Sequence, residues 1–223
     1  MLLLIETSAE FPSVVLSSGK GKQDWTRESI EKQSHAECIP VFINEAFEFV
    51  KENNEEIQAV VINQGPGSYT GLRIGSSIVK GICYGSGIPL IAVSGLTAQG
   101  NWALKNNLHL NKAYSMLDAR RNEVYFSEVN LNDADSNVKS LILGENEFEI
   151  HPNSIIVGNS NTKAVELISE LGICERFDTT LHAKFMIDIA WSKYQNRDFE
   201  DVAYFEPKYA KDFVPGISKK FSV

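Results

Sequence analysis

The chain passes from a strand into a helix at Gln64-Gly65-Pro66-Gly67-Ser68-Tyr69-Thr70-Gly71-Leu72-Arg73-Ile74-Gly75. The apolar residues 57–63 that precede this stretch predict a strand buried on both faces. Glycine and proline permit the sharp turn, and a helix is expected over about residues 70–85. The stretch is not a Walker loop, because no Gly-Lys-Ser or Gly-Lys-Thr follows it.

Small residues recur along this predicted helix. Gly71 and Gly75, and then Ser77, Gly81 and Gly85, fall at four-residue intervals, which places small side chains where another helix can approach closely. Each helical glycine costs about 1 kcal/mol relative to alanine, so close helix contact is expected to return that stability. The spacing does not decide whether the contact is internal or with a partner.

Strands and helices alternate on both sides of this stretch. The first half predicts strands at 2–5, 13–17, 23–28, 57–63 and 89–93, with helices at 36–50, 70–85 and from residue 97. Ser34 and Glu37 have the spacing of a capping box at the first helix. The second half predicts strands at 113–117, 123–129, 138–143, 147–150 and 154–158, helices at 162–171 and 184–195, and an extended segment at 203–214. We expect two lobes, 1–107 and 108–223, with mixed sheets and flanking helices. No internal sequence repeat is visible.

Composition limits the classes of function. The 223 residues carry a net charge of −8, which disfavours nucleic-acid binding by this chain alone. The exception is a locally basic C-terminal tail with Lys208, Lys211, Lys219 and Lys220. The three cysteines and four histidines lack metal-site spacing, so neither a metal site nor a disulfide framework is predicted. No membrane span or signal peptide is indicated, and the cytoplasm is the expected compartment.

Two groups of polar residues could carry chemistry. Glu6, Thr7 and Ser8 follow the first strand, an arrangement with which a lobe of an actin-like ATPase holds the cation and phosphates of a nucleotide. The alternative is a turn that caps itself through its hydroxyl groups. The second group lies in the turn at 118–123 and comprises Asp118, Arg120, Arg121 and Glu123. It faces either the cleft between lobes or solvent, as an ordinary hairpin turn.

Several of these stretches, in this order, resemble the TsaB (YeaZ) family of tRNA threonylcarbamoyladenosine biosynthesis proteins. They are the long stretch from Gln64, Ile5-Glu6-Thr7-Ser8, the helix start at Ser34-His35, the strand 89–94 and the turn 118–125. The resemblance covers the first lobe and the start of the second, while residues 130–201 are generic. It implies an actin-like ATPase (ribonuclease H-like) α/β fold.

The resemblance also implies that this chain lacks the metal ligands and the adenosine-binding turn of its catalytic relative. In the catalytic relative, TsaD, a histidine pair four residues apart ligates a metal after the strand at 89–93. Those positions here are Gly95 and Gln99. The Gly-Gly turn that accompanies adenosine in this fold is replaced by Val157-Gly158-Asn159, with one glycine. We therefore expect no metal and no tightly bound nucleotide on this chain alone.

From these expectations we predict that the chain is a non-catalytic scaffold subunit that binds and activates a TsaD-like threonylcarbamoyltransferase. The resemblance implies a complex with TsaD-like and TsaE-like subunits, in which the partners hold ATP or ADP and a metal and tRNA binds only through the complex. Without its partner the chain is expected to form a homodimer. The expected docking face comprises eight residues: Phe42, Phe47, Val50, Ile74, Gly75, Ile78, Gly81 and Ile82. The alternatives are an autonomous ATPase or kinase-like enzyme of the same fold, and a protease that acts on its relative, for which no nucleophile–base motif is present.

Overall fold

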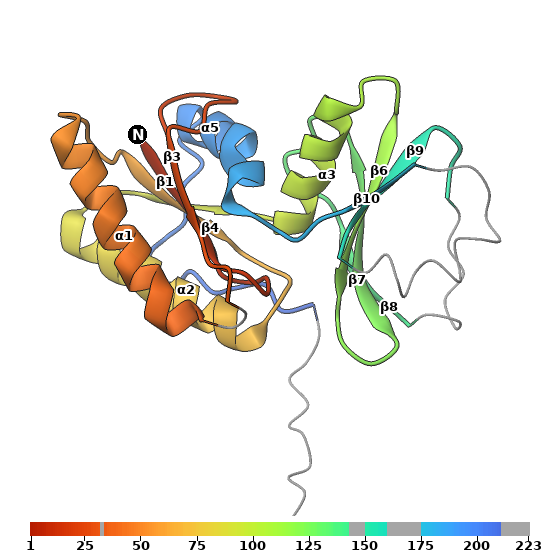
Figure 1. Ribbon diagram of the computed structural model, residues 1–223, viewed down its shortest axis with the longest axis horizontal. Coiled ribbons are helices and arrows are strands. Elements are labelled where there is room, and N and C mark those ends of the chain that lie inside the picture. Colours follow the sequence, from red (N-terminus) through yellow and green to blue (C-terminus); the bar gives the residue numbers. More distant parts are fainter. Residues whose placement is uncertain (32–33, 143–149, 160–174, 211–223) are drawn as a thin grey trace, which may run out of the picture.

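The computed structural model describes residues 1–31, 34–142, 150–159 and 175–210. Two five-stranded sheets form two lobes that lie side by side (Figure 1). The first sheet has the order β3-β2-β1-β4-β5 and the second has the order β10-β9-β6-β7-β8. In the described residues no helix has the length and apolar character needed to span a membrane.

The first sheet is built from residues 2–93. Its strands are β1 (Leu2–Glu6), β2 (Ser13–Ser17), β3 (Trp25–Glu28), β4 (Ala59–Asn63) and β5 (Leu90–Val93). The strands β1, β2 and β3 form an antiparallel meander, and β4 and β5 continue it parallel to β1. The strands β1, β2, β4 and β5 are fully buried, as the unbroken apolar run of β4 predicted.

Helices cover both faces of this sheet. On one face lie α1 (His35–Glu52) and α2 (Tyr69–Ser86), which pack on Leu3, Ile5 and their neighbours. On the other face lie the 3₁₀ helix η1 (Ala183–Met186) and α5 (Ile187–Gln195), which pack on Leu2, Leu4 and Val61. Successive strand residues point to opposite faces, so each strand serves both layers.

The second sheet repeats the pattern of the first. Its strands are β6 (Lys112–Asp118), β7 (Glu123–Asn130), β8 (Val138–Ile142), β9 (Ser154–Gly158) and β10 (Glu175–Asp178). Here β6, β7 and β8 are antiparallel neighbours, and β9 and β10 continue parallel to β6. The same arrangement of three antiparallel strands followed by two parallel strands therefore occurs twice.

Three helices pack across the expected lobe boundary at residue 107. The helix α3 (Gly95–Asn106) lies between the lobes, and its Ala103 and Leu104 pack with Ala113 and Val129 of the second sheet. The chain also returns to the first lobe at η1 and α5. Lobe membership follows the apolar faces of these helices rather than their place along the chain.

Other details differ from the sequence prediction. Ser34 precedes α1 as expected, but its side chain makes no capping bond and its Oγ bonds instead to Ser29 and to the carbonyl of Glu31. The strand β10 was not predicted. The predicted helix at 162–171, most of the strand at 147–150 and the tail beyond residue 210 lie outside the described residues.

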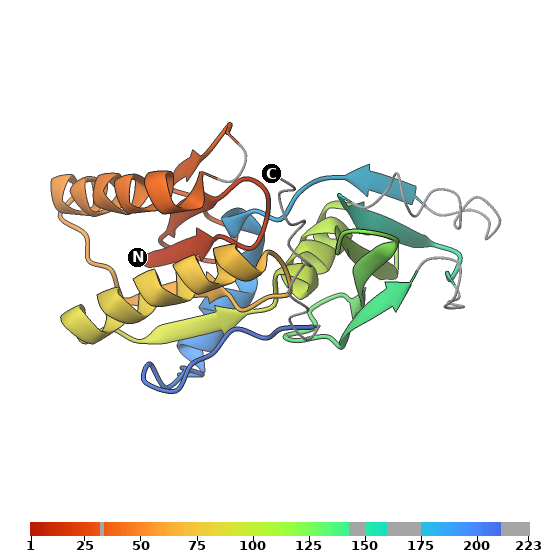
Figure 2. The same cartoon turned by 90° about the horizontal axis from the view of Figure 1, so that it is seen from below.

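Residues 200–210 form a C-terminal strap that packs along the first lobe. Figure 2 shows it running beside α2 and β5 toward the second lobe. Its Glu200 pairs with Leu90, Phe205 is buried, and Lys80 Nζ donates to the carbonyl oxygens of Ala203 and Phe205. The backbone N–H of Lys208 then donates to the carbonyl of Gln64 at 2.7 Å.

Candidate functional site

The loop after β1 forms a buried polar network. Glu6 is 1% exposed, and its Oε1 accepts the backbone N–H groups of Ser8 (2.5 Å) and Ala9 (3.2 Å). Asn63, at the end of β4, donates to Glu6 Oε2 (2.6 Å) and Ser8 Oγ (2.7 Å). The Oδ1 atom of Asn63 accepts the N–H groups of Gly65 and Gly95, each at 2.9 Å.

This network determines the electrostatics of Glu6. Burial raises the pKa of its carboxyl above 4.5, and the hydrogen bonds from Ser8 and Asn63 oppose that rise. No cationic side chain is among the causes of the shift. A cation at Glu6 would have to displace Asn63, which holds the loop in place. Glu6, Ser8 and Asn63 thus satisfy one another, whereas Thr7 Oγ1 is buried without a hydrogen-bond partner among the described residues. A nucleotide-binding role for Glu6, Thr7 and Ser8 stays a prediction.

Thr7 lies so close to α2 that only glycine fits at two positions of the helix. A Cβ on Gly71 would lie 1.9 Å from the Thr7 carbonyl oxygen, and one on Gly75 would lie 2.2 Å from Thr7 Oγ1. Both glycines are buried, and they let α2 approach the loop after β1. Gly75 was assigned to the docking face from its spacing, but the close approach it permits is inside this chain.

Gly95 and Gln99, where the resemblance implied that metal ligands have been lost, also make contacts inside the chain. Gly95 begins α3, and a Cβ there would lie 2.3 Å from Asn63 Nδ2. Gln99 is buried and accepts the hydroxyl of Ser115 at 2.7 Å. In the described part of the chain no three His, Cys, Asp or Glu residues are grouped so that they could hold a metal ion.

The second polar group lies on the turn between β6 and β7. Asp118, Arg120 and Arg121 are exposed, and both arginines have positive φ. Arg120 N–H donates to Asp118 Oδ1 at 2.6 Å, and Glu123 Oε2 accepts from Ser140. The bond from Arg120 to Asp118 lies within an exposed turn, and a functional role for this polar group stays a prediction.

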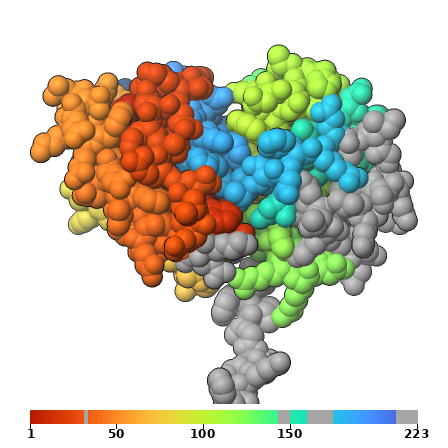
Figure 3. Space-filling model, in the orientation of Figure 1, coloured from red at the N-terminus to blue at the C-terminus, as the bar shows by residue number. Residues whose placement is uncertain are grey.

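The expected docking residues fall into three groups. Val50 and Gly75 are buried, and Ile74 is half-buried. Phe42, Ile78 and Ile82 are half-buried against the core below α1 and α2. Phe47 (38%) and Gly81 are exposed. Sequence spacing missed Val41 (53%) on α1 and Tyr84 (88%) on α2, which are more exposed. Figure 3 shows α1 lying across the surface of the first lobe.

The outer side of α2 is open. A Cβ on Gly81 or Gly85 would meet no atom within 4 Å, unlike one on Gly71 or Gly75. Ser77 is exposed one turn before Gly81. The two glycine pairs therefore have different environments: the first pair faces Thr7 and the second faces solvent.

The two sheets and their connections define the class of the protein. Two lobes that each repeat a mixed sheet, with helices on the faces, form the actin-like ATPase fold. A solved structure of an uncharacterized Pseudomonas aeruginosa protein with similarity to peptidase YeaZ superposes with a TM-score of 0.79 at 20% identity, covering 94% of this chain and 99% of that one. YeaZ from Pseudomonas aeruginosa superposes with a TM-score of 0.76 at 20% identity, covering 93% and 98%.

Comparison of sequences identifies the family. The family model described as TsaD, tRNA N6-adenosine threonylcarbamoyltransferase, matches residues 29–147, and the chain belongs to this family. The tRNA threonylcarbamoyladenosine biosynthesis protein TsaB of Haemophilus influenzae is 35% identical over 57% of this chain, and the match spans only about half (53%) of that protein. TsaB of Escherichia coli is 26% identical over 96% of this chain and 95% of its own length. The resemblance to TsaB (YeaZ) is thus confirmed.

Proposed function

We propose that this chain is a non-catalytic subunit in the biosynthesis of threonylcarbamoyladenosine in tRNA. In this proposal it binds and activates a TsaD-like enzyme, which transfers threonylcarbamoyl from threonylcarbamoyl-AMP to the adenosine next to the anticodon. Membership of the TsaD family and similarity to two TsaB proteins over different lengths support the pathway. The docking role rests on the structure of α1 and α2.

The open stripe Ser77–Gly81–Gly85 on α2 is the observation that carries the docking role. Exposed helical glycines cost stability, and among the described residues nothing lies within 4 Å of a Cβ placed on Gly81 or Gly85. The neighbouring Ile78 and Ile82 are only half-buried, and Tyr84 is almost fully exposed. A helix of a partner can approach the small residues closely and cover these apolar side chains. The same face could pair with a second copy when the partner is absent.

The polar loops support the absence of catalysis by this chain. Glu6 is enclosed by Ser8, Ala9 and Asn63, and Gly95 and Gln99 have structural contacts of their own. ATP or ADP and the metal would accordingly be held by the partner subunits, including a TsaE-like ATPase. With a net charge of −8, the chain would meet tRNA only within the complex.

Gly81→Glu tests the docking face without disturbing the fold. Glutamate is a better helix former than glycine, and the position is open, so the variant should fold as well as the wild type. The charge should weaken co-elution with a TsaD-like subunit at least tenfold and remove any self-association. Arg121→Ala, on the distant exposed turn, is the matched control and should assemble normally. A folded Gly81→Glu variant with wild-type assembly would place the docking face elsewhere.

A separate assay addresses the alternatives. Turnover of ATP by the pure isolated chain would favour the autonomous ATPase, and cleavage of a TsaD-like chain would favour the protease. We expect neither activity above the background of a mock purification.

A further inference from the structure

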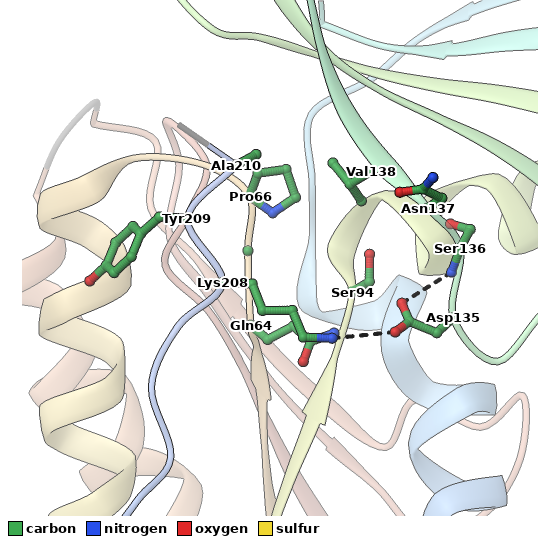
Figure 4. Close-up of a pocket in the computed structure, with 11 residues that line it drawn as sticks. Gln64, Pro66, Ser94, Asp135, Ser136, Asn137, Val138, Lys208, Tyr209 and Ala210 are labelled. Atoms are coloured by element: carbon green, nitrogen blue, oxygen red, sulfur yellow. Dashed lines mark hydrogen bonds and ion pairs between the residues drawn. The ribbon is translucent and has the colours of Figure 1, made fainter. Parts of the chain in front are cut away.

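A cavity of about 470 Å³ lies between the lobes, at the ends of β4 and β5. Residues 64–66 and Ser94 line it from the first lobe, residues 135–138 from the second, and residues 208–210 from the strap. Figure 4 shows the ion pair of Lys208 and Asp135 reaching across it, with Nζ and Oδ2 3.3 Å apart. Three separate parts of the chain thus enclose one space.

The topology of the first sheet accounts for the position of this cavity. The strands β4 and β5 are parallel neighbours, but α2 after β4 packs on one face of the sheet and α3 after β5 begins on the other. The connections therefore diverge between Gln64 and Ser94. In open α/β sheets ligands bind in the crevice at the carboxyl ends of strands where the connections diverge in this way.

Gln64 is the second, independent observation. The residue is 6% exposed, and its backbone groups bond to Val93 and Lys208. Its side-chain amide, however, has no hydrogen-bond partner among the described residues, although it lines the cavity. The amide atoms of Gln64 are not among the fully buried, unsatisfied polar atoms of the described residues, so they are accessible from the cavity that the residue lines. The amide offers one acceptor and two donors to whatever enters.

The surroundings determine which ligand chemistry fits. The charges of Lys208 and Asp135 cancel, so the cavity attracts neither anions nor cations strongly. Three amide groups near the cavity are already bonded: Gly71 N–H donates to Ser68 Oγ, and the N–H groups of Gly65 and Gly95 donate to Asn63 Oδ1. The apolar side chains of Pro66 and Val138 form opposing walls.

We propose that this cavity binds a compact, uncharged, planar molecule whose edge carries a hydrogen-bond donor beside an acceptor, as in an amide or lactam, and that Gln64 reads that edge. Such an edge satisfies both halves of the Gln64 side chain at once. Pro66 and Val138 would lie beside the ligand. The site is separate from the α1–α2 face, so this inference does not depend on the docking proposal.

The test uses the isolated full chain labelled with ¹⁵N. Uracil and 2-pyrrolidone are the lactam probes, and acetate and inorganic phosphate are the anionic controls. We expect a saturable shift of the Gln64 side-chain NH₂ signals with the lactams, and no such shift with the anions. The NH₂ pair is assigned by its disappearance in Gln64→Leu.

Three variants separate a binding role from a structural one. Gln64→Leu should weaken lactam binding at least tenfold while its Tm stays equal to or above that of the wild type. Gln64→Glu, which keeps the acceptors but loses the donors, should weaken it similarly. Gln58→Leu, which replaces an exposed glutamine outside the cavity, should bind as the wild type does. No saturable shift, unchanged binding in Gln64→Leu, equal binding of acetate, or a lower Tm in Gln64→Leu would each overturn the proposal.

Discussion

Asn63 joins three loops that are far apart in the sequence. Its side chain bonds to Glu6 and Ser8 after β1, to Gly65 after β4, and to Gly95 after β5. The sequence indicates that Glu6, Thr7 and Ser8 form a special turn, because an acid and two hydroxyl residues end an apolar strand. It gives no sign that an asparagine 57 residues away completes that turn, since the contact arises only from the pairing of β1 with β4.

The buried carboxyl group of Glu6 should make the stability of the fold depend on pH. Because burial raises its pKa above 4.5, the folded chain keeps this proton over a pH range in which the unfolded chain has lost it. The contribution of Glu6 to stability is thus fully present below pH 4.5 and is lost as the pH rises through the raised pKa. Within that range the free energy of unfolding should fall by about 1.4 kcal/mol per pH unit.

The comparison with Glu6→Gln isolates this effect, because all other titrating groups are shared. Urea titrations at successive pH values should show the wild type losing stability relative to the variant as the pH rises from 4.5. A difference between the two proteins that stays constant with pH, or changes in the opposite direction, would mean that the hydrogen bonds outweigh burial.

The helix α2 shows what spacing can and cannot predict for an element. The interval of four residues correctly marks the small residues as positions of close approach, as Gly71 and Gly75 demonstrate against Thr7. It does not tell which of them are internal, because that depends on the rotation of the helix over the sheet. Gly75 and Gly81 have the same residue type, yet one is buried and the other is exposed.

Alanine at Gly71 and at Gly81 should therefore have opposite effects. A Cβ on Gly71 would clash with the backbone of Thr7, so Gly71→Ala should destabilise the chain by about 2–3 kcal/mol or more. A Cβ on Gly81 meets open space, so Gly81→Ala should stabilise it by up to about 1 kcal/mol. Thermal and urea unfolding of the two variants measure this, and equal effects at both positions would refute the assignment of the two glycines.

At the scale of the whole molecule, the chain builds one sheet pattern twice without a visible sequence repeat. The sequence predicted most strands and helices because their apolar residues alternate or recur locally. It could not predict the edge strand β10 or the contacts that the C-terminal strap makes with both lobes. The strand β10 is exposed throughout and has no apolar signal, and the strap meets Gln64 and Asp135 only in the folded chain.

The strap should be held by its buried aromatic residue more than by its ion pair. Phe205 is 6% exposed and packs with the core below α2, so Phe205→Ala should destabilise the chain by about 3 kcal/mol or more and expose the strap to limited proteolysis. The ion pair of Lys208 and Asp135 is largely exposed, so Lys208→Ala should cost less than about 1 kcal/mol. A larger loss in Lys208→Ala than in Phe205→Ala would reverse this account of the strap.

The most direct test of the central claim is the threonylcarbamoyladenosine content of tRNA in a reconstituted reaction. The mixture holds the TsaD-like and TsaE-like subunits, ATP, threonylcarbamoyl-AMP and unmodified tRNA, with or without this chain. The account predicts no modification by this chain alone, strong modification when the wild type or Arg121→Ala joins the partners, and at least a tenfold loss with Gly81→Glu. Full modification without this chain, or with a folded Gly81→Glu variant, would contradict it.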